Sequence, residues 1–291
     1  MLKNETSTIF LTVYVDDIIN AANNIETMEK VKTDLVKVFK MKDMGTINYC
    51  LGIEFKQDLK NGTITMCQSK YTKEILTRFG MENSKPMITP MDGNQKLKKP
   101  DEEGTDEELP YQKLVGSLMY LSVSTRPDIT YAVSALSQFN TNYRQEHWIA
   151  AKRVLRYLKG TSGYEHVYRM SEKYLEGFID ADWAGCTDDR RSYTGYVFLL
   201  AGAAILWGAK KQKTVALSST EAEYMALSEG TKQAMYLQSF FREFSMKPLT
   251  TTKELDNWSK TQFSTHEQST STSYTISFEK LTKKRRSNQN M

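Results

Sequence analysis

The chain has 291 residues, enough for about two domains, and its 40% hydrophobic and 25% charged residues predict packed cores rather than global disorder. Lys and Arg number 39 against 35 Asp and Glu, and the net charge of +4 is compatible with a nucleic-acid partner without indicating one. The three cysteines, Cys50, Cys67 and Cys186, exclude a disulfide scaffold, and with only three histidines they do not favour a structural zinc site.

The apolar segments do not predict a membrane partner. The longest of them, residues 196–209, is too short to span a bilayer and is interrupted by glycines. Residues 9–15 are also apolar, but Asp16 and Asp17 follow without a small-residue cleavage site, so no signal peptide is expected. A reducing compartment is therefore expected, with the protein in the cytoplasm or the nucleus.

The first 81 residues have a mixed α/β pattern. Asp16 and Asp17 fall at the tip of a predicted hairpin, and Asn23 and Glu26 have the spacing of a capping box. An Asn-Gly pair at position 61 is typical of a type I′ hairpin turn. The expected elements are a β-hairpin over 9–19, a helix over 28–38, strands over 49–56 and 63–67, and a helix over 71–79.

The amino-acid composition changes in the middle of the chain. Residues 82–109 contain three prolines, and residues 101–108 within them carry six acids, which indicate an exposed connection. Apolar residues at helical spacing then predict three helices, beginning at Pro110, at Pro127 and near Gln145. Proline suits the first position of a helix, since no backbone donor is needed there.

A second domain begins near Tyr174. Strands are expected over 175–180, 193–200, 203–207 and 215–217, followed by a helix over 219–244 with Gly230 as a candidate break. Beyond Pro248 apolar residues are sparse, and we expect no regular structure there. The four bases of residues 283–286 are compatible with a nuclear-import patch, a pattern with many false positives.

Two adjacent carboxylates, Asp16 and Asp17, lie at the tip of the first predicted hairpin. Magnesium prefers oxygen ligands, and two-metal phosphoryl transfer needs carboxylates that are held rigidly near each other. The plain alternative is an ordinary turn, since Asp-Asp suits the end of any strand.

A second acidic group comprises Asp180, Asp182 and Glu223. Asp180 ends an apolar strand, and Glu223 lies early on a predicted helix. Glu221 and Glu223 are about 200° apart around that helix, so only one of them can face a site, and Glu223 borders the apolar stripe. The alternative is a surface glutamate on a solvated helix face.

Other candidates are weaker. Asp256 is a third possible acid, although it equally suits a turn in a loose tail. Arg153, Lys210 and Lys211 are placed to follow a phosphate backbone, with Tyr157 or Trp207 stacking on sugars or bases; a solvated helix face is the alternative. Because the chain has no glycine-rich phosphate loop, nucleophile elbow or cysteine–histidine pair, the chemistry left is that of carboxylates and metals.

Ten segments of the sequence resemble segments of a known family and occur in the same order as in that family. The chain resembles the C-terminal part of the Pol polyprotein of copia-type LTR retrotransposons, from about residue 9 to residue 244. The segments are Tyr14–Asp17 (YVDD), Leu51–Ile53 (LGI), Gln68–Met81, Thr89–Met91 (TPM), Tyr111–Leu121 (YQKLVGSLMYL), Thr125–Ile129 (TRPDI), Lys152–Thr161 (KRVLRYLKGT), Asp180–Gly185 (DADWAG), Arg190–Tyr196 (RRSYTGY) and Val215–Tyr224 (VALSSTEAEY).

The resemblance implies an α/β (α+β) architecture. It would comprise a partial reverse-transcriptase palm with a helical thumb and connection, then an RNase H-like mixed sheet flanked by helices. The implied divisions are a partial palm and thumb over 1–81, an exposed linker over 82–109, a helical thumb and connection over 110–170, an RNase H-like domain over 171–257 and a degenerate polar and basic tail over 258–291.

The resemblance also implies the site. Asp180, Glu223 and Asp256 would hold two Mg²⁺ ions, with Mn²⁺ as a substitute, and cleave RNA in an RNA–DNA hybrid. Asp16 would be a polymerase metal ligand with Asp17 beside it. Ser218, Ser219, Lys210, Lys211 and Arg153 would contact nucleic acid.

The sequence also departs from the family pattern. The polymerase aspartate expected upstream of the Asp16 hairpin does not occur here, so polymerase activity is not expected from this chain alone, though it could act with an intact Pol polyprotein. After Asp256 the fourth acid of the family pattern is not found. The alternative to a working nuclease is a catalytically dead relic that at most binds nucleic acid; an unrelated α/β protein is the third reading.

Overall fold

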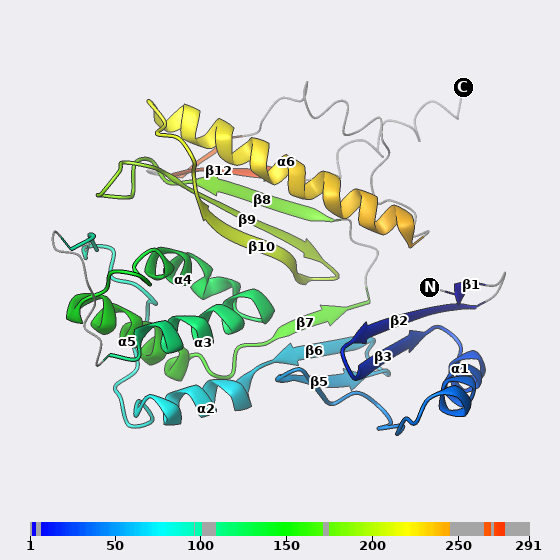
Figure 1. Cartoon of the computed structure of the whole chain (residues 1–291). Coiled ribbons are helices and arrows are strands. Elements are labelled where there is room, and N and C mark those ends of the chain that lie inside the picture. The colour runs from blue at the N-terminus through cyan, green and yellow to red at the C-terminus, as the bar shows by residue number, and fades with distance from the viewer. Residues whose placement is uncertain are drawn as a thin grey trace, which may run out of the picture. The chain divides into compact units, whose positions relative to one another are not determined.

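The structure is a computed structural model, and it describes residues 2–3, 7–95, 97–100, 109–170, 175–244, 265–268 and 271–276. The chain divides into two compact units, residues 1–56 and residues 57–291, which we describe separately. Figure 1 labels most of the helices and strands of both units.

The first unit contains the predicted hairpin. β2 (Thr8–Tyr14) pairs antiparallel with β3 (Asp17–Ala22), and the short β1 (Leu2–Lys3) pairs with the start of β2. Tyr14 pairs with Asp17, so the turn itself consists of Val15 and Asp16, and Asp17 already belongs to a strand. Val15 has a φ of 50°, the left-handed conformation that such a tight turn requires.

The helix of the first unit, α1 (Ile25–Val38), begins one residue later than the capping box predicted. Asn24 is the N-cap, and its side chain accepts a hydrogen bond from the backbone N–H of Thr27 at 3.1 Å. Asn23 instead accepts from the N–H of Thr8 at 2.8 Å and closes the base of the hairpin. The predicted capping role of Asn23 is therefore wrong, because its side chain is engaged elsewhere.

The predicted strand over 49–56 is divided into β4 (Tyr49–Cys50) and β5 (Ile53–Asp58) by a tight turn. Leu51 and Gly52 have φ values of 50° and 72°, as a type I′ turn requires. The type I′ turn predicted at Asn61-Gly62 is wrong, because only Gly62 of that pair has a positive φ.

The second unit contains a helical body. β6 (Thr63–Cys67) leads into α2 (Ser69–Arg78) and pairs antiparallel with β7 (His166–Arg169), a strand that the sequence pattern does not predict. The three predicted helices are present, with Pro110 as an N-cap residue. They are α3 (Tyr111–Ser124), α4 (Thr130–Ser137) after the 3₁₀ turn η1 (Pro127–Ile129), and α5 (Gln145–Gly160).

These helices share one hydrophobic core, because each contributes an apolar face at helical spacing. Side chains with no measurable exposure come from α2, α3, η1, α4 and α5, and they include Ile75, Leu114, Leu118, Leu121, Ile129, Leu136, Val154, Leu155 and Leu158.

The described part of the connection over 82–109 runs along α5. Arg156 and Lys159 donate to the carbonyl oxygens of Lys85 and Ser84, each at 2.7 Å, and the N–H of Met87 donates to Arg156 O at 3.3 Å. The segment contains no helix or strand in its described residues, and these bonds hold it against the helical body.

An ion pair in the second unit joins the buried Arg126 to the partly exposed Asp128. The Arg126 side chain is 4% exposed and donates to Asp128 through Nε at 2.9 Å and Nη2 at 2.7 Å. Nη1 also donates to Thr161 O at 3.2 Å, and Tyr157 donates its hydroxyl to Asp128 at 2.8 Å. Burial disfavours ionised Asp128, but the hydrogen bonds and charge of Arg126 outweigh it and lower the pKa.

The rest of the second unit is a five-stranded sheet with a helix on one face (Figure 1). The strand order is β10-β9-β8-β12-β11, and α6 packs against β8 and β9. The elements are β8 (Glu176–Ala181), β9 (Tyr193–Leu200), β10 (Ala203–Lys211), α6 (Ser219–Glu243), β11 (Thr265–Gln268) and β12 (Ser271–Ile276).

The predicted α/β class is confirmed, but the prediction of a mixed sheet is wrong for the described strands. Every described pair in this sheet is antiparallel, including β12 against β8. β11 runs in the same direction as β8, but β12, the second arm of the β11–β12 hairpin, occupies the position beside β8. The strand that pairs with β8 at this edge is therefore antiparallel to it, as the other strands of the sheet are to their neighbours.

Two further local predictions fail in this sheet region. Residues 215–217 form no strand, and α6 continues through Gly230 without a break. Gly230 is fully buried against β8, where a Cβ would overlap the side chain of Ile179. The glycine therefore permits close packing of α6 on the sheet.

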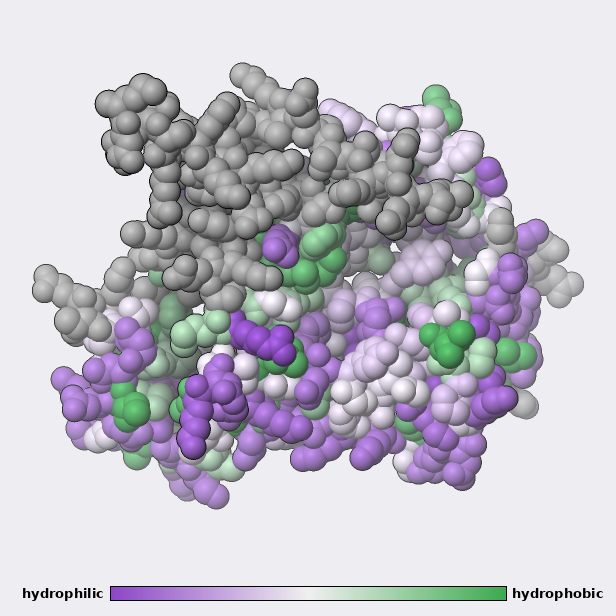
Figure 2. Space-filling model, turned by 180° about the vertical axis from the view of Figure 1, so that it is seen from behind, coloured by the Kyte–Doolittle hydropathy of each residue, from purple (hydrophilic) through white to green (hydrophobic). Residues whose placement is uncertain are grey.

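The described surface is largely polar on the face that Figure 2 shows, with small, separate apolar patches among hydrophilic side chains. None of the described helices is long and apolar enough to cross a membrane.

Replacing Arg126 by Met should lower the free energy of unfolding by about 1–3 kcal/mol, because the hydrogen bonds of the buried guanidinium to Asp128 and Thr161 would be lost. Urea denaturation followed by tryptophan fluorescence would measure the loss. The control Arg78→Met removes a half-exposed ion pair with Glu74 and should cost less than about 1 kcal/mol. An equal loss in the two variants would contradict the prediction.

Acid should weaken the fold through His166. Its burial lowers the pKa, and Nε2 lies 2.9 Å from Thr125 O, to which it donates in its neutral form. As pH falls through about 6.5, the unfolded chain binds the proton first, so stability falls, by at most about 1.4 kcal/mol per pH unit. Unfolding free energies measured between pH 7 and pH 5 should depend less on pH in His166→Gln; an unchanged slope would contradict this.

Candidate functional site

Asp180 and Glu223 lie on separate elements and are brought together by the fold. Asp180 is near the end of β8, and Glu223 is in the second turn of α6, which packs on that strand. Partial burial raises the pKa of Asp180, and the negative charge of Glu223 raises it further. The two carboxylates therefore lie close enough for their negative charges to repel each other.

The neighbouring Asp182 has a different role. Its carboxylate accepts a hydrogen bond from the N–H of Tyr193 and lies directly over Gly185, where a Cβ would collide with it. Burial raises the pKa of Asp182, and the charge of Asp180 adds to this shift. Asp182 therefore closes the loop between β8 and β9.

The N-terminus of α6 determines which glutamate faces Asp180. Ser218 is the N-cap and accepts from the N–H of Glu221 at 3.1 Å. The Glu221 carboxylate turns back and accepts from the N–H of Leu217 at 2.7 Å. Glu223 lies on the side of the buried Ala222 and Ala226, as the helical spacing predicts.

The acid pair offers the oxygen donors that Mg²⁺ prefers, and a divalent cation would relieve the repulsion between the two carboxylates. Asp256, the implied third ligand, lies outside the described residues. Within the described ranges, no group of three or more His, Cys, Asp or Glu is arranged to hold a metal ion. The structure therefore supplies two candidate ligands, Asp180 and Glu223.

The basic candidates differ in how firmly they are held. Lys211 is largely buried, with its ammonium 2.8 Å from Asp189 and 2.9 Å from Gln138 Oε1. Arg153 lies 3.5 Å from Asp92 and donates to Thr89 at 2.9 Å.

Lys210 is the most exposed of these cations, and it lies 3.6 Å from Glu229 on α6. Ser219 is exposed in the first turn of the same helix, next to the N-cap Ser218. Of the predicted nucleic-acid contacts, Lys210, Ser218 and Ser219 are thus the exposed ones.

The two aromatic candidates are engaged within the fold. Tyr157 is buried and bonded to Asp128, and Trp207 donates its indole N–H to Ser122 O at 2.7 Å. The Trp207 ring also stacks on His166 with centroids 5.5 Å apart. These contacts within the fold do not favour the prediction that Tyr157 or Trp207 stacks on sugars or bases.

The adjacent acids Asp16 and Asp17 belong to the first unit. Asp16 is exposed in the turn, and Asp17 is exposed at the start of β3. Burial raises the pKa of the Cys50 thiol, and the charge of Asp17 contributes. The Asp17 carboxylate therefore lies near the β4–β5 hairpin, at the end of β2 and β3 where the chain turns.

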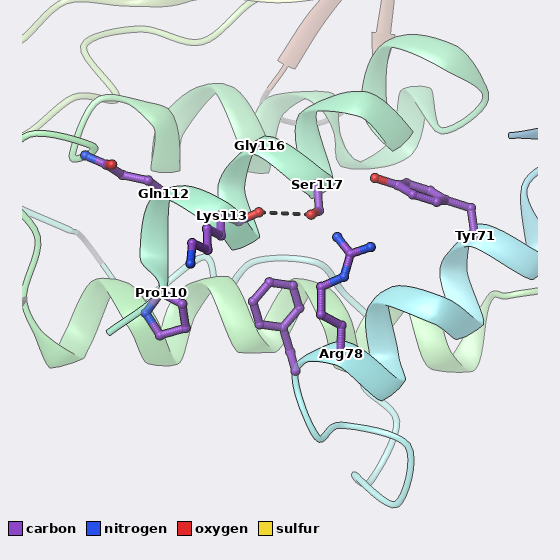
Figure 3. A pocket seen from close by; sticks show the side chains of 8 residues that line it. Tyr71, Arg78, Pro110, Gln112, Lys113, Gly116 and Ser117 are labelled. Carbon is purple, nitrogen blue, oxygen red and sulfur yellow. Dashed lines mark hydrogen bonds between the residues drawn. The ribbon is translucent and has the colours of Figure 1, made fainter. Parts of the chain in front are cut away.

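An open cavity of about 610 Å³ lies between α2 and α3 (Figure 3). Tyr71, Arg78 and Lys113 line it, and the Ser117 hydroxyl donates to Lys113 O at 2.9 Å. None of the predicted site residues lines this cavity.

The sequence analysis assigned no role to Gln212 or Trp183. Gln212 is buried, and its amide donates to Ala222 O at 2.8 Å and Thr194 Oγ1 at 3.1 Å, which fixes the approach of β10 to α6. Trp183 is 56% exposed three residues after Asp180. A polar residue between two lysines gives no sequence signal of burial, but a tryptophan beside a candidate acid could have been singled out.

Comparison with known proteins places this architecture in a family. Residues 2–93 match the family model described as reverse transcriptase (RNA-dependent DNA polymerase). The retrovirus-related Pol polyprotein from transposon TNT 1-94 of Nicotiana tabacum is 42% identical over 249 residues, 84% of this chain and 19% of the relative. The corresponding polyprotein from transposon RE2 of Arabidopsis thaliana is 37% identical over 248 residues, 85% of this chain and 17% of the relative.

A shorter relative, the transposon Ty5-1 protein YCL074W of Saccharomyces cerevisiae, is 37% identical over 223 residues, 76% of this chain and 72% of the relative. No solved structure matches the chain. These matches define a retrotransposon protein with a reverse-transcriptase region. The chain belongs to the family of Pol polyproteins of copia-type retrotransposons, and it spans less than a fifth of the length of the two polyproteins.

Magnesium should stabilise the fold through the acid pair. Mg²⁺ should raise the thermal unfolding temperature of the wild-type chain, since binding to the native state adds to its stability. In Asp180→Asn this rise should be lost, while the metal-free variant should be at least as stable as the wild type because the repulsion with Glu223 is gone. Glu176→Gln, on the same strand, is the control; a full Mg²⁺ shift in Asp180→Asn would contradict the assignment.

Proposed function

We propose that the second unit carries a metal-dependent ribonuclease H that cleaves the RNA strand of an RNA–DNA hybrid. The observation that carries the proposal is the close packing of α6 on β8, which brings Glu223 near enough to Asp180 for its charge to raise the pKa of that carboxyl. Two carboxylates on rigid elements, with a β-sheet behind them, are a suitable support for phosphodiester hydrolysis by divalent metals.

Asp180 and Glu223 would hold the metal, with Asp256 as the third ligand in the proposal. When bound, two Mg²⁺ ions, or Mn²⁺ in their place, activate a water and stabilise the leaving oxygen. The protein's part is to hold the two carboxylates at fixed positions, which the close packing of Gly230 on Ile179 supports. Ser219 and Lys210, which are exposed near this site, would contact the hybrid backbone.

For the first unit we propose that Asp16 is a metal ligand of nucleotidyl transfer, with Asp17 beside it. The match of residues 2–93 to the reverse-transcriptase model and the position of Asp16 at a hairpin tip support this role. The partners proposed are an RNA–DNA hybrid, other nucleic acid and an intact Pol polyprotein, in the cytoplasm or the nucleus.

A folded domain that only binds nucleic acid is the second candidate. The observation that favours it is the exposure of Lys210 and Ser219, since these residues could contact a hybrid without catalysis. Such a domain would bind a hybrid with or without Asp180, whereas a nuclease requires that carboxylate for turnover.

Cleavage of a labelled RNA–DNA hybrid by the full chain would test the nuclease. With Mg²⁺, and then with Mn²⁺, the wild type should release short RNA products. Asp180→Asn should reduce the cleavage rate by more than about a hundredfold, which exceeds the loss expected when a residue only supports a metal ligand. Glu176→Gln should cleave normally. Binding without cleavage by folded wild-type chain would establish the second candidate instead.

A further inference from the structure

Exposed apolar side chains occur close to both acids in the sequence. Trp183, Val215 and Leu217 are 56%, 46% and 86% exposed, and we call these three residues the Trp183 platform. The indole N–H of Trp183 donates to Ala216 O at 3.4 Å, which joins the loop after β8 to the segment before α6. Three apolar side chains that face solvent at one place indicate a binding surface.

The backbone beneath the platform is firmly anchored. At one end, Gln212 is buried, and its N–H donates to Ser192 O at 2.8 Å. At the other end, the N–H of Leu217 donates to the Glu221 carboxylate at 2.7 Å. Between them Ala216 is buried. The exposure of Val215 and Leu217 is therefore built into a fixed loop, which lowers the entropic cost of binding a ligand.

In the sequence, each part of the Trp183 platform lies close to one of the two acids. Trp183 follows Asp180 by three residues, and Leu217 directly precedes the helix that carries Glu223. Lys213 is exposed in the same anchored segment. The stretches of chain next to the two acids therefore present an aromatic ring, aliphatic side chains and one cation to solvent.

We propose that the Trp183 platform and Lys213 bind the sugar–phosphate backbone of the nucleic acid next to the phosphate that the acid pair engages. A sugar ring would pack on Trp183 and Leu217, and a neighbouring phosphate would pair with Lys213. Nucleic acid matches all three features, since it combines apolar sugar faces with regularly spaced negative charge. The proposal rests on the proposed nuclease site, because a substrate bound there would be the nucleic acid that reaches the Trp183 platform.

Binding by the full chain in an Asp180→Asn background, which preserves the substrate, tests the platform. Fluorescence anisotropy would measure the affinity for a labelled RNA–DNA hybrid and, in a parallel arm, for single-stranded DNA. Trp183→Ala should weaken hybrid binding about tenfold, the range of one lost aromatic contact, and Trp183→Phe should retain most of the affinity. Lys213→Ala should reduce the slope of log K against log salt by about one.

The matched controls are Ile149→Ala, an exposed apolar residue on α5, and Lys60→Ala, an exposed lysine remote in sequence from the acids. Both should leave affinity and salt slope unchanged. Unchanged binding in Trp183→Ala would overturn the proposal, as would equal weakening by Trp183→Phe, which would assign the effect to the bond with Ala216. Tighter binding of single-stranded DNA than of hybrid would overturn the choice of occupant.

The two proposals fail separately. If Asp180 is required for cleavage but Trp183→Ala binds hybrid normally, the nuclease stands and the platform is overturned. If the chain binds hybrid through Trp183 but does not cleave it, the platform stands and the nuclease is overturned.

Discussion

The helical body of the second unit is joined by the ion pair between the buried Arg126 and the partly exposed Asp128. A charge is costly to bury alone, and here each partner is satisfied by the other and by hydrogen bonds to α5 and the residues after it. Thr125, next to Arg126, donates to Gln68 before α2 and accepts from His166 on β7. One short segment therefore joins elements that are far apart in the sequence.

The same segment also connects the helices to the sheet. His166 stacks on Trp207 of β10, and that indole donates to the last turn of α3. The acid pair lies farther along this sheet, on β8 and α6, where Gly230 allows the helix to approach Ile179. The positions of the two carboxylates thus follow from the packing of Gly230 on Ile179, two residues that are not themselves acids.

Features set by neighbouring residues could be predicted from the sequence. The Asp16 hairpin, the helices of the second unit and the orientation of Glu223 relative to Glu221 all follow from periods of two or 3.6 residues. Features set by distant partners could not. β7 is recognisable only through its pairing with β6, and Gly230 is a breaker in isolation but a packing residue against Ile179. The contact of Asp180 with Glu223 was implied by family resemblance, not by spacing.

The pairing of β12 with β8 has a consequence for the order of folding. β8, β9 and β10 are joined by short connections, so their pairings close small loops and can form early. The other edge of β8 must wait for residues 271–276. Until they arrive, the strand that carries Asp180 exposes a row of unpaired backbone groups, an edge open to mispairing with another chain during synthesis.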